Sequence, residues 1–582
     1  MSKVTVRGTG QIVSLTKGNF VAKGGEGSIH IIGDTVYKDM GIKSMIPDGK
    51  FTELAVLDHP AIIVPEDVLL NKNNKPCGYT MRAVPNKPIP LAQILTKGYR
   101  QREGVTPDHM MELVTQMMSG LSYIHSKKGY FQVDGNELNY MVTGDYKEVY
   151  FIDTNSYQTP HYPADAIMLS VRDWSVSQDN HKAWQWSELS DAYSFAIISF
   201  YMFTAIHPFK GRHPDYTDVK TLMVDNMKHH KSVLDPDTKF PIGPIYFPFE
   251  DMIPGGKDGA FMQWYRALFT EGKRLPIPDD FQATIAFVAK VKEIIGTNNF
   301  SIEEIHKYAS MITGYYDNAG KNVVVTKDQV YINRVLKPKP ANKFRVGFTP
   351  VMNTAIAAWL DDDSKLQMQN LDSQTSVRVE LSGKSLMACE GRLYVQSQSD
   401  IYEILYIEQG ASLIASTKSV ASVMPNATTM FQGVVMQDMF GSTMVSVFPE
   451  AGHHRQISVP ELNGYRVTEA KYEGNVLMVV GINKAAGHYN RFVFRFASNW
   501  SSYDCRVVEN VTPAGINFTV TDAGICICIT EDDDVEIFSN RKDSSSVKSI
   551  DDPEIKSDMR LCHSGAQVRI AYGDKLHSFS MK

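Results

Sequence analysis

Cysteine is scarce in this chain, which has six cysteines among its 582 residues. They show no spacing typical of a metal site, and they are too few for a dense disulfide framework. We therefore expect a protein of a reducing cytoplasm. Cys526 and Cys528 are two residues apart in GICICIT, which predicts that both pack on one face of a buried strand.

The chain also lacks a strong charge of either sign and a long hydrophobic run. Its formal net charge of -6 gives no electrostatic reason to expect binding to nucleic acid or to a membrane surface. The N-terminus MSKVTVRGTG has no apolar core of a secretion signal. The most apolar run, residues 192–206, is short for a membrane span and predicts a buried helix. The length predicts two to four soluble domains.

Residues 129–158, GYFQVDGNELNYMVTGDYKEVYFIDTNSYQ, combine several groups suited to phosphoryl transfer. Asp134 and Asn139 stand in a D-x-x-x-x-N spacing, and Asp153 follows the apolar strand VYFI. In such a set one carboxylate orients a hydroxyl, while the other and the carboxamide hold magnesium. The same residue types also mark turns, so a plain β-hairpin is the competing interpretation.

Further motifs lie on either side of this stretch. Residues 11–40 alternate like strands around the glycine cluster AKGGEGSI, and Lys38 follows in the next strand. From Thr106, the expected N-cap of a helix, the apolar residues show a period near 3.6. Asp191 then precedes the run AYSFAIISFYMFTAI, and Arg274 follows in FTEGKRLPIPDDF. The order of these motifs is more informative than any one of them.

In this order the motifs resemble those of the protein kinases. The resemblance implies a bilobal α+β fold, with an N-terminal lobe over residues 1–105 and a C-terminal lobe over residues 106–298. It also implies ATP and Mg²⁺ as cofactors. Asp134 would orient the acceptor hydroxyl, and Asn139 and Asp153 would bind the metal.

The resemblance further implies a nucleotide site in the N-terminal lobe. Lys38 would hold the α and β phosphates, and Glu53 on the following helix would be its acidic partner. The hinge would contact adenine through the backbone of Met81 and Ala83. The loop over the phosphates would contain Gly24, Gly25, Gly27 and Ile29.

The catalytic motifs depart from the usual kinase pattern in three places. HRD is replaced by QVD at 132–134, DFG by DTN at 153–155, and the lysine two places after the catalytic aspartate by Asn136. This pattern resembles a bacterial and phage branch of kinase-like proteins. The metal-binding residues Asn139 and Asp153 remain, and so do Asp134 and Lys38, so we expect an active kinase. A Ser/Thr acceptor is favoured. A pseudokinase scaffold is the alternative, since a positive charge beside the transferred phosphate is lost.

The second half consists of short alternating segments with an internal repeat. Each copy reads as a strand, a turn glycine, an apolar strand, a polar turn and a strand, and the glycines are 42, 41, 50 and 41 residues apart. A period near 40 residues is typical of β-propeller blades. Two weaker copies precede these five, which predicts five to seven blades over residues 320–582. The turn glycines are Gly391, Gly433, Gly474, Gly524 and Gly565.

Two further expectations concern this half. Residues 299–319 are predicted to form a helical linker, because Ser301 and Glu304 have the spacing of a capping box. No W-D or kelch signature appears, so a β-sandwich or an irregular β domain remains the competing interpretation. With no catalytic constellation in this half, we expect it to bind a protein substrate or an assembly partner.

Overall fold

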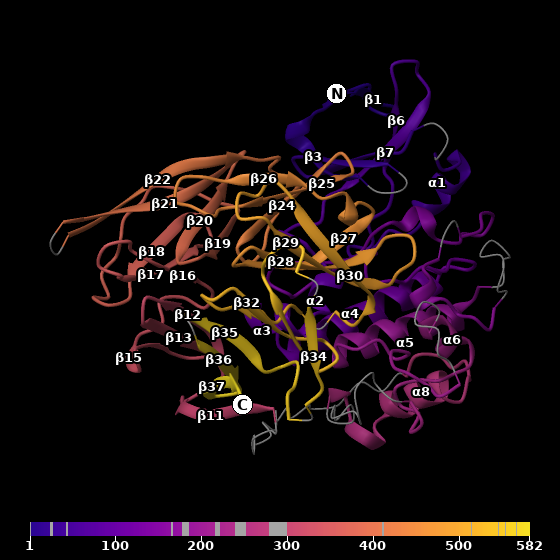
Figure 1. The fold of residues 1–582 in the computed structure, drawn as a ribbon. Coiled ribbons are helices and arrows are strands. Elements are labelled where there is room, and N and C mark those ends of the chain that lie inside the picture. The colour runs from indigo at the N-terminus through magenta and orange to yellow at the C-terminus, as the bar shows by residue number, and fades with distance from the viewer. Residues whose placement is uncertain are drawn as a thin grey trace.

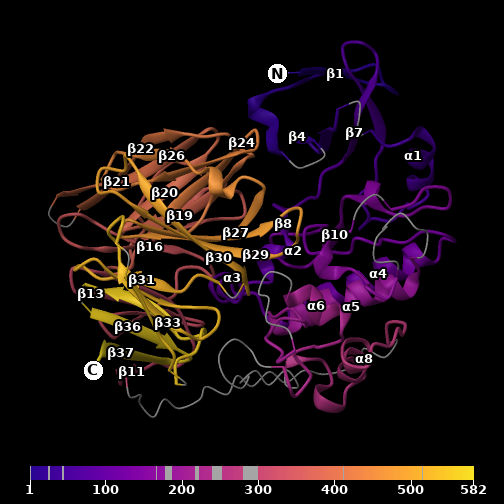
Figure 2. The ribbon, with the colours of Figure 1, turned by 45° about the vertical axis from the view of Figure 1, so that its right-hand side comes forward.

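The computed structural model describes residues 2–23, 27–41, 45–164, 167–176, 186–215, 222–238, 252–278, 299–409, 412–513, 515–544, 546–552, 554–565 and 567–582. The first part of the chain mixes helices and sheets, and the second part consists of antiparallel sheets (Figure 1). The two parts lie side by side in both ribbon views (Figures 1 and 2). Among the described helices, none combines the length and the hydropathy that a membrane crossing requires.

The chain begins with a seven-stranded sheet in the order β2-β1-β6-β7-β5-β4-β3, with antiparallel pairing throughout. The predicted strands around the glycine cluster are confirmed. The strands are β1 (Ser2–Val6), β2 (Ile12–Leu15), β3 (Phe20–Lys23), β4 (Ser28–Ile32), β5 (Thr35–Asp39), β6 (Asp67–Leu70) and β7 (Pro76–Arg82).

A mainly helical region follows this sheet. Its helices are α1 (Asp48–Leu54), inserted between β5 and β6, then α2 (Leu91–Ile94), α3 (Lys97–Glu103), α4 (Pro107–His125), α5 (Glu188–Thr204), α6 (Leu222–Lys228) and α8 (Ala260–Phe269). A three-stranded sheet in the order β10-β9-β8 lies among them, formed by β8 (Ile89–Pro90), β9 (Tyr140–Val142) and β10 (Val149–Phe151).

Helices α4 and α5 form the centre of this region, as their sequences predict. The Thr106 hydroxyl accepts a hydrogen bond from the His109 N–H and so caps α4. The stripe that includes Leu113, Met117 and Leu121 is buried. Helix α5 is buried along its whole length from Ser190 onward, which confirms the buried helix predicted from residues 192–206.

Seven antiparallel sheets follow one another in the described residues from 299 onward. Each of the five predicted turn glycines lies between the first and second strands of a sheet and has a positive φ, between 55° and 77°. These positions favour glycine because a side chain is strained there. The sheets are β12 (Ile312–Asn318) to β15 (Val335–Lys337), β16 (Arg345–Phe348) to β18 (Leu366–Asn370), β19 (Ser385–Cys389) to β22 (Ser412–Ser422), β23 (Thr428–Met430) to β26 (Arg455–Ser458), β27 (Tyr465–Glu473) to β30 (Tyr503–Val511), β31 (Phe518–Val520) to β34 (Val547–Ile550), and β35 (Arg560–Ser564) to β37 (Lys575–Met581) with β11.

The inner strands of these sheets complete the list of elements. They are β13 (Lys321–Thr326), β14 (Val330–Ile332), β17 (Ala355–Leu360), β20 (Arg392–Ser397), β21 (Asp400–Gln409), β24 (Val434–Met439), β25 (Ser442–Val447), β28 (Val476–Asn483), β29 (Tyr489–Phe496), β32 (Ile525–Ile529), β33 (Val535–Ser539) and β36 (Gln567–Tyr572).

The sheets of the second part form a closed circuit. Buried apolar clusters join each sheet to the next in chain order. A further cluster joins Val324 on β13 to Ala571 on β36, and so connects the last sheet to the first. Cys526 and Cys528 are both buried in one of these clusters, as predicted.

The predicted helical linker over residues 299–319 is wrong. Residues 300–307 form strand β11, which pairs antiparallel with β37 at the other end of the second part. Residues 312–318 form β12 of the next sheet. The pairing partner of β11 lies more than two hundred residues away in sequence, so a local capping-box spacing could not reveal it.

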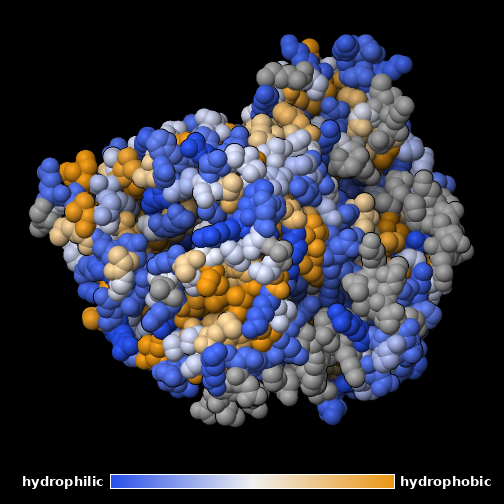
Figure 3. Space-filling view, in the orientation of Figure 1, coloured by the Kyte–Doolittle hydropathy of each residue, from blue (hydrophilic) through white to orange (hydrophobic). Residues whose placement is uncertain are grey.

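Contacts between the two parts are both apolar and charged. Val480 and Ile482 on β28 belong to the main hydrophobic cluster of the first part. Arg102 on α3 makes a bidentate ion pair with Glu469 on β27, with N–O distances of 2.7 and 3.3 Å. Figure 3 shows that the face in view carries mixed polar and apolar side chains, with apolar ones gathered around β32 and β35.

Candidate functional site

The predicted lysine lies on β5 in a row of residues that crosses the first sheet. Ala22 pairs with Ile29, Ile29 with Lys38, and Lys38 with Tyr79. Residues directly opposite each other on neighbouring strands point to the same face of a sheet. The four side chains therefore share the face that carries Lys38.

Lys38 reaches the end of strand β10 from this face. Its Nζ lies 2.7 Å from Asp153 Oδ1 and 3.1 Å from Asn155 Oδ1. The Tyr79 hydroxyl donates to the same Asn155 oxygen at 2.7 Å. Lys38 is 8% exposed and Asp153 is 35% exposed, so the carboxylate lies at the edge of the group and is open to solvent.

The backbone of the loop before β9 is held in place by the carboxylate of Asp191 on α5. Its two carboxylate oxygens accept the backbone N–H groups of Gln132 and Val133, each at 2.8 Å. His125 Nε2 lies 2.9 Å from the same carboxylate. Burial alone would lower the pKa of His125, but the hydrogen bond and the charge of Asp191 raise it above its ordinary value. Asp191 thereby joins α5 to the loop that contains Asp134.

Asp134 lies at the centre of the loop, almost fully buried. Its Oδ1 accepts hydrogen bonds from Asn136 Nδ2 at 2.7 Å and from the Met168 N–H at 2.8 Å. Asn139 Nδ2 donates to Oδ2 at 3.2 Å and to the Asp134 backbone oxygen at 2.9 Å. Burial raises the pKa of Asp134, against the effect of these donors.

Asn139 and Asp153 lie on neighbouring chain segments, because the Ile152 N–H donates to the Asn139 backbone oxygen at 3.0 Å. The Asn139 amide nitrogen is used by Asp134, so its amide oxygen is the atom suited to a metal. A carboxylate and a carboxamide oxygen fit a hard cation such as Mg²⁺. The donor set is thus compatible with the predicted metal.

The glycine loop is only partly described. Gly24 and Gly25 lie outside the described residues. At Gly27 an added Cβ would overlap the backbone of Asp39, so this glycine is required for close packing of β4 on β5. Ile29 lies beside Lys38 in the row described above.

The predicted pairing of Glu53 with Lys38 is wrong. Glu53 lies in the last turn of α1, and its carboxylate contacts the ring Nδ1 and the backbone N–H of His161. Helix α1 ends at Leu54, one residue after Glu53, and in this position the Glu53 side chain faces the segment after β10. Sequence spacing alone did not define this orientation.

The structure also differs from the predicted hinge, in which the backbone of Met81 and Ala83 contacts adenine. Met81 is part of β7, opposite Val36, and the Ala83 N–H donates to the Asp34 backbone oxygen at 2.8 Å. The sheet therefore already uses the Ala83 N–H, and this group is not available to adenine in the described conformation. The reason is that β7 and β5 stay paired up to the end of β7.

Three residues of the site were missed from the sequence. Asn155 occupies the third position of DTN, and its amide in place of glycine was the available signal. Tyr79 and Met168 had no local signal, because their contacts depend on strand register and on the path of the chain after β10.

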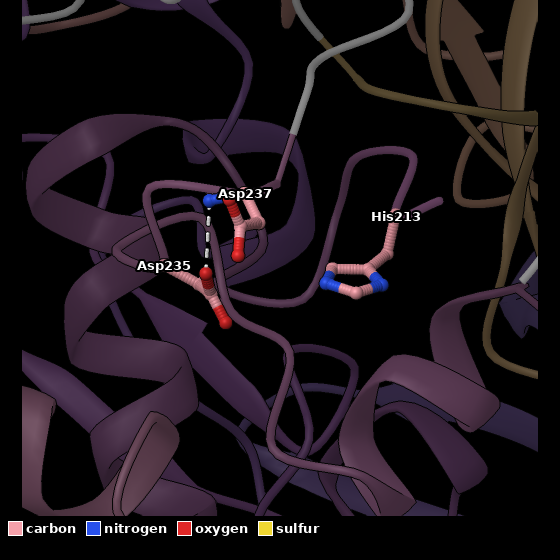
Figure 4. Close-up of side chains that lie close together, drawn as sticks. All are labelled: His213, Asp235 and Asp237. Atoms are coloured by element: carbon pink, nitrogen blue, oxygen red, sulfur yellow. Dashed lines mark hydrogen bonds between the residues drawn. The ribbon is translucent and has the colours of Figure 1, made fainter. Parts of the chain in front are cut away.

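A second group of ligating side chains lies outside this site. One potential ligand atom from each of His213, Asp235 and Asp237 lies within 4.8 Å of the others (Figure 4). Asp235 also accepts the Asp237 N–H at 2.9 Å and pairs with Lys231 at 3.7 Å. These contacts account for Asp235 within the fold without a metal.

Comparisons with known proteins give little further information. No protein-family model matches the chain, and no curated protein matches it. Among solved structures, the kinase PK-1 of Cydia pomonella granulovirus is similar with a TM-score of 0.27 and 12% identity, over 34% of this chain and 72% of that chain. A likeness of this size carries no argument about function.

Proposed function

We propose that the chain is an ATP-dependent protein kinase, with a Ser/Thr acceptor favoured. The observation that carries the proposal is the contact between Lys38 and Asp153, which are 115 residues apart and lie 2.7 Å from each other. A strand lysine beside a carboxylate and next to a D-x-x-x-x-N loop is the arrangement that phosphoryl transfer from ATP requires.

Each residue has a role in this reaction. The acceptor oxygen bonds to the γ-phosphorus while the bond between the β,γ-bridging oxygen and that phosphorus breaks, and ADP leaves. Asp134 orients the hydroxyl and accepts its proton, and its raised pKa suits this task. Asn139 and Asp153 hold Mg²⁺, which when bound neutralises phosphate charge. Lys38 holds the α and β phosphates.

The second part is proposed to be a seven-bladed β-propeller that binds a protein substrate or an assembly partner. Seven successive antiparallel sheets in a closed circuit support this interpretation. So does the pairing of β11 with β37, because it joins the first and last strands in one sheet and leaves no open end between them. The boundary with the kinase domain then lies near residue 299.

A pseudokinase scaffold is the second candidate, and two observations favour it. The Ala83 N–H is used within the sheet, and Asp134 Oδ1 is occupied by the Met168 N–H. Both contacts have to change before ATP and an acceptor bind in the usual kinase manner. A scaffold needs no such change.

Thermal stabilisation and phosphate transfer measured together distinguish the two candidates. For a kinase, ATP with Mg²⁺ raises the melting temperature of the wild type, and label from γ-³²P-ATP enters the chain itself or a protein mixture. Asp153→Ala should lose the transfer. The matched control is Asp362→Ala, an exposed carboxylate on the turn between β17 and β18. Stabilisation without transfer supports the scaffold, and equal transfer by wild type and Asp153→Ala refutes the assignment.

A further inference from the structure

The side-chain amide of Asn155 contacts Lys38, the lysine of the proposed nucleotide site. Its Oδ1 receives Lys38 Nζ at 3.1 Å and the Tyr79 hydroxyl at 2.7 Å, and Asn155 and Tyr79 are each 1% exposed. We propose that Asn155, held by Tyr79, is the positioning residue for Lys38, the role that the sequence predicts for Glu53. This inference rests on the proposed kinase function.

The backbone before Asn155 explains why its side chain turns back toward Lys38. Asp153 has a left-handed conformation with φ of 60°, which aspartate tolerates better than most residues. One turn of 3-10 helix follows, η3 (Thr154–Ser156), closed by the Ser156 N–H on the Asp153 oxygen at 3.1 Å. The Thr154 hydroxyl donates to the Ile63 oxygen at 2.8 Å and fixes this turn to the body of the domain. Asp153 and Asn155 therefore reach the same ammonium group.

Tyr79 fixes Asn155 from the sheet. Tyr79 on β7 lies directly opposite Lys38 on β5, so both side chains extend from the same face of the sheet. Both donate to the Asn155 Oδ1 atom. The Lys38 Nζ also lies 5.7 Å from the centre of the Tyr79 ring, within the range of a cation–π contact. Because both neighbours of Oδ1 are donors, the Asn155 amide must present its oxygen here.

The neutral charge of Asn155 matters for the reaction. Asp153 is assigned to the metal, and a carboxylate that coordinates a metal gives less of its charge to a lysine. The contact with Asn155 holds Lys38 in position without adding a negative charge beside it. Asn155 therefore takes nothing from the positive charge of Lys38, which phosphate binding requires. An acidic residue at position 155 would share that charge.

Three substitutions separate these contributions in the full chain. Asn155→Leu removes the acceptor, Tyr79→Phe removes the hydrogen bond that the tyrosine hydroxyl donates to Asn155, and Asn155→Asp keeps an acceptor oxygen but adds a negative charge. Tyr37→Phe is the matched control, because Tyr37 is a buried tyrosine on the same strand as Lys38 but packs in the cluster between β1, β2 and β6. Each variant is assayed for the dissociation constant of Mg²⁺-ATP, for kcat, for the KM of ATP and of the protein acceptor, and for melting temperature.

We expect Asn155→Leu to weaken ATP binding by about tenfold to a hundredfold, the range that corresponds to losing a hydrogen bond to a charged group. Tyr79→Phe should weaken it by a few-fold. Asn155→Asp should keep the melting temperature of the wild type yet bind ATP more weakly, which a merely structural role would not produce. The KM of the acceptor should be unchanged in all three.

The outcomes for this inference and for the proposed function are distinct. A wild type that neither binds Mg²⁺-ATP nor transfers phosphate refutes the function itself. A wild type that does both, with Asn155→Leu and Tyr79→Phe indistinguishable from Tyr37→Phe in ATP affinity, overturns the role of Asn155 alone. If Asn155→Leu does not fold, Tyr79→Phe and Asn155→Asp still decide the matter.

Discussion

The ion pair between Arg102 and Glu469 offers a direct test of how the two parts are joined. Arg102 also contacts Glu103 at 3.1 Å, and Glu469 accepts a further hydrogen bond from Gln432 at 3.1 Å. The side chain of Glu469 is 1% exposed and that of Arg102 is 20% exposed. Arg102→Met would leave the Glu469 carboxylate buried with only the neutral Gln432 amide as its remaining described donor.

The expected cost of Arg102→Met is large because the remaining charge is buried. Removing one partner of a buried pair costs about 3–5 kcal/mol, whereas an exposed pair contributes about 0–1 kcal/mol. Arg7→Met is the matched control, since Arg7 and Asp48 form a pair at 3.4 Å with 45% and 70% exposure. Replacing both partners, in Arg102→Met with Glu469→Leu, should recover much of the loss, because no unpaired charge remains.

Scanning calorimetry is the suitable assay, since a chain of this size need not unfold in one step. We expect Arg102→Met to lower the first unfolding transition by roughly 5 °C or more, and Arg7→Met to leave it within about 2 °C. The double variant should lie between them. A first transition of Arg102→Met equal to that of Arg7→Met would refute the expectation that this buried pair stabilises the junction between the two parts.

Three further predictions concern the loop, its support and the β sheets. Burial raises the pKa of Glu137 from 4.5 to about 7, with the Tyr489 hydroxyl donating to it at 3.0 Å. The folded state then binds this proton more tightly, so its contribution to stability is present at low pH and is lost as pH rises through about 7. Glu137→Gln should therefore raise the free energy of unfolding at pH 8 by roughly 1–3 kcal/mol relative to wild type, and with it the melting temperature, with little change at pH 5. Equal melting curves at pH 8 would contradict this. Asp191→Ala removes the acceptor of two backbone N–H groups, so transfer should be lost and stability should fall by about 3 kcal/mol in calorimetry; retained transfer would show that the loop needs no such support. Gly433→Ala places a Cβ 2.7 Å from the Tyr472 oxygen at φ 73°, and should cost more than Gly320→Ala at φ 80° with open space around it, which thermal unfolding of the two variants compares.

Local motifs predicted those parts of the site that are close in sequence. Asp134, Asn136 and Asn139 lie within one loop, so their spacing was sufficient to bring them together. The turn glycines of the second part were predictable for the same reason, because each sheet repeats one local conformation.

Contacts that depend on register or on chain direction were not predictable. Lys38 and Tyr79 become neighbours only through the pairing of β5 with β7. The orientation of Glu53 depends on where α1 ends. Residues 300–307 include a capping-box spacing, but their pairing with the distant strand β37 makes them a strand.

Transfer of ³²P from γ-³²P-ATP is the most direct test of the proposed kinase. Wild type, Asp134→Asn and Asp362→Ala are each incubated with Mg²⁺-ATP and a protein mixture, and the incorporated label is counted. We predict label with wild type and with Asp362→Ala, and a loss of at least a hundredfold with Asp134→Asn, in keeping with the removal of a positioned general base. Equal incorporation by wild type and Asp134→Asn would contradict the account.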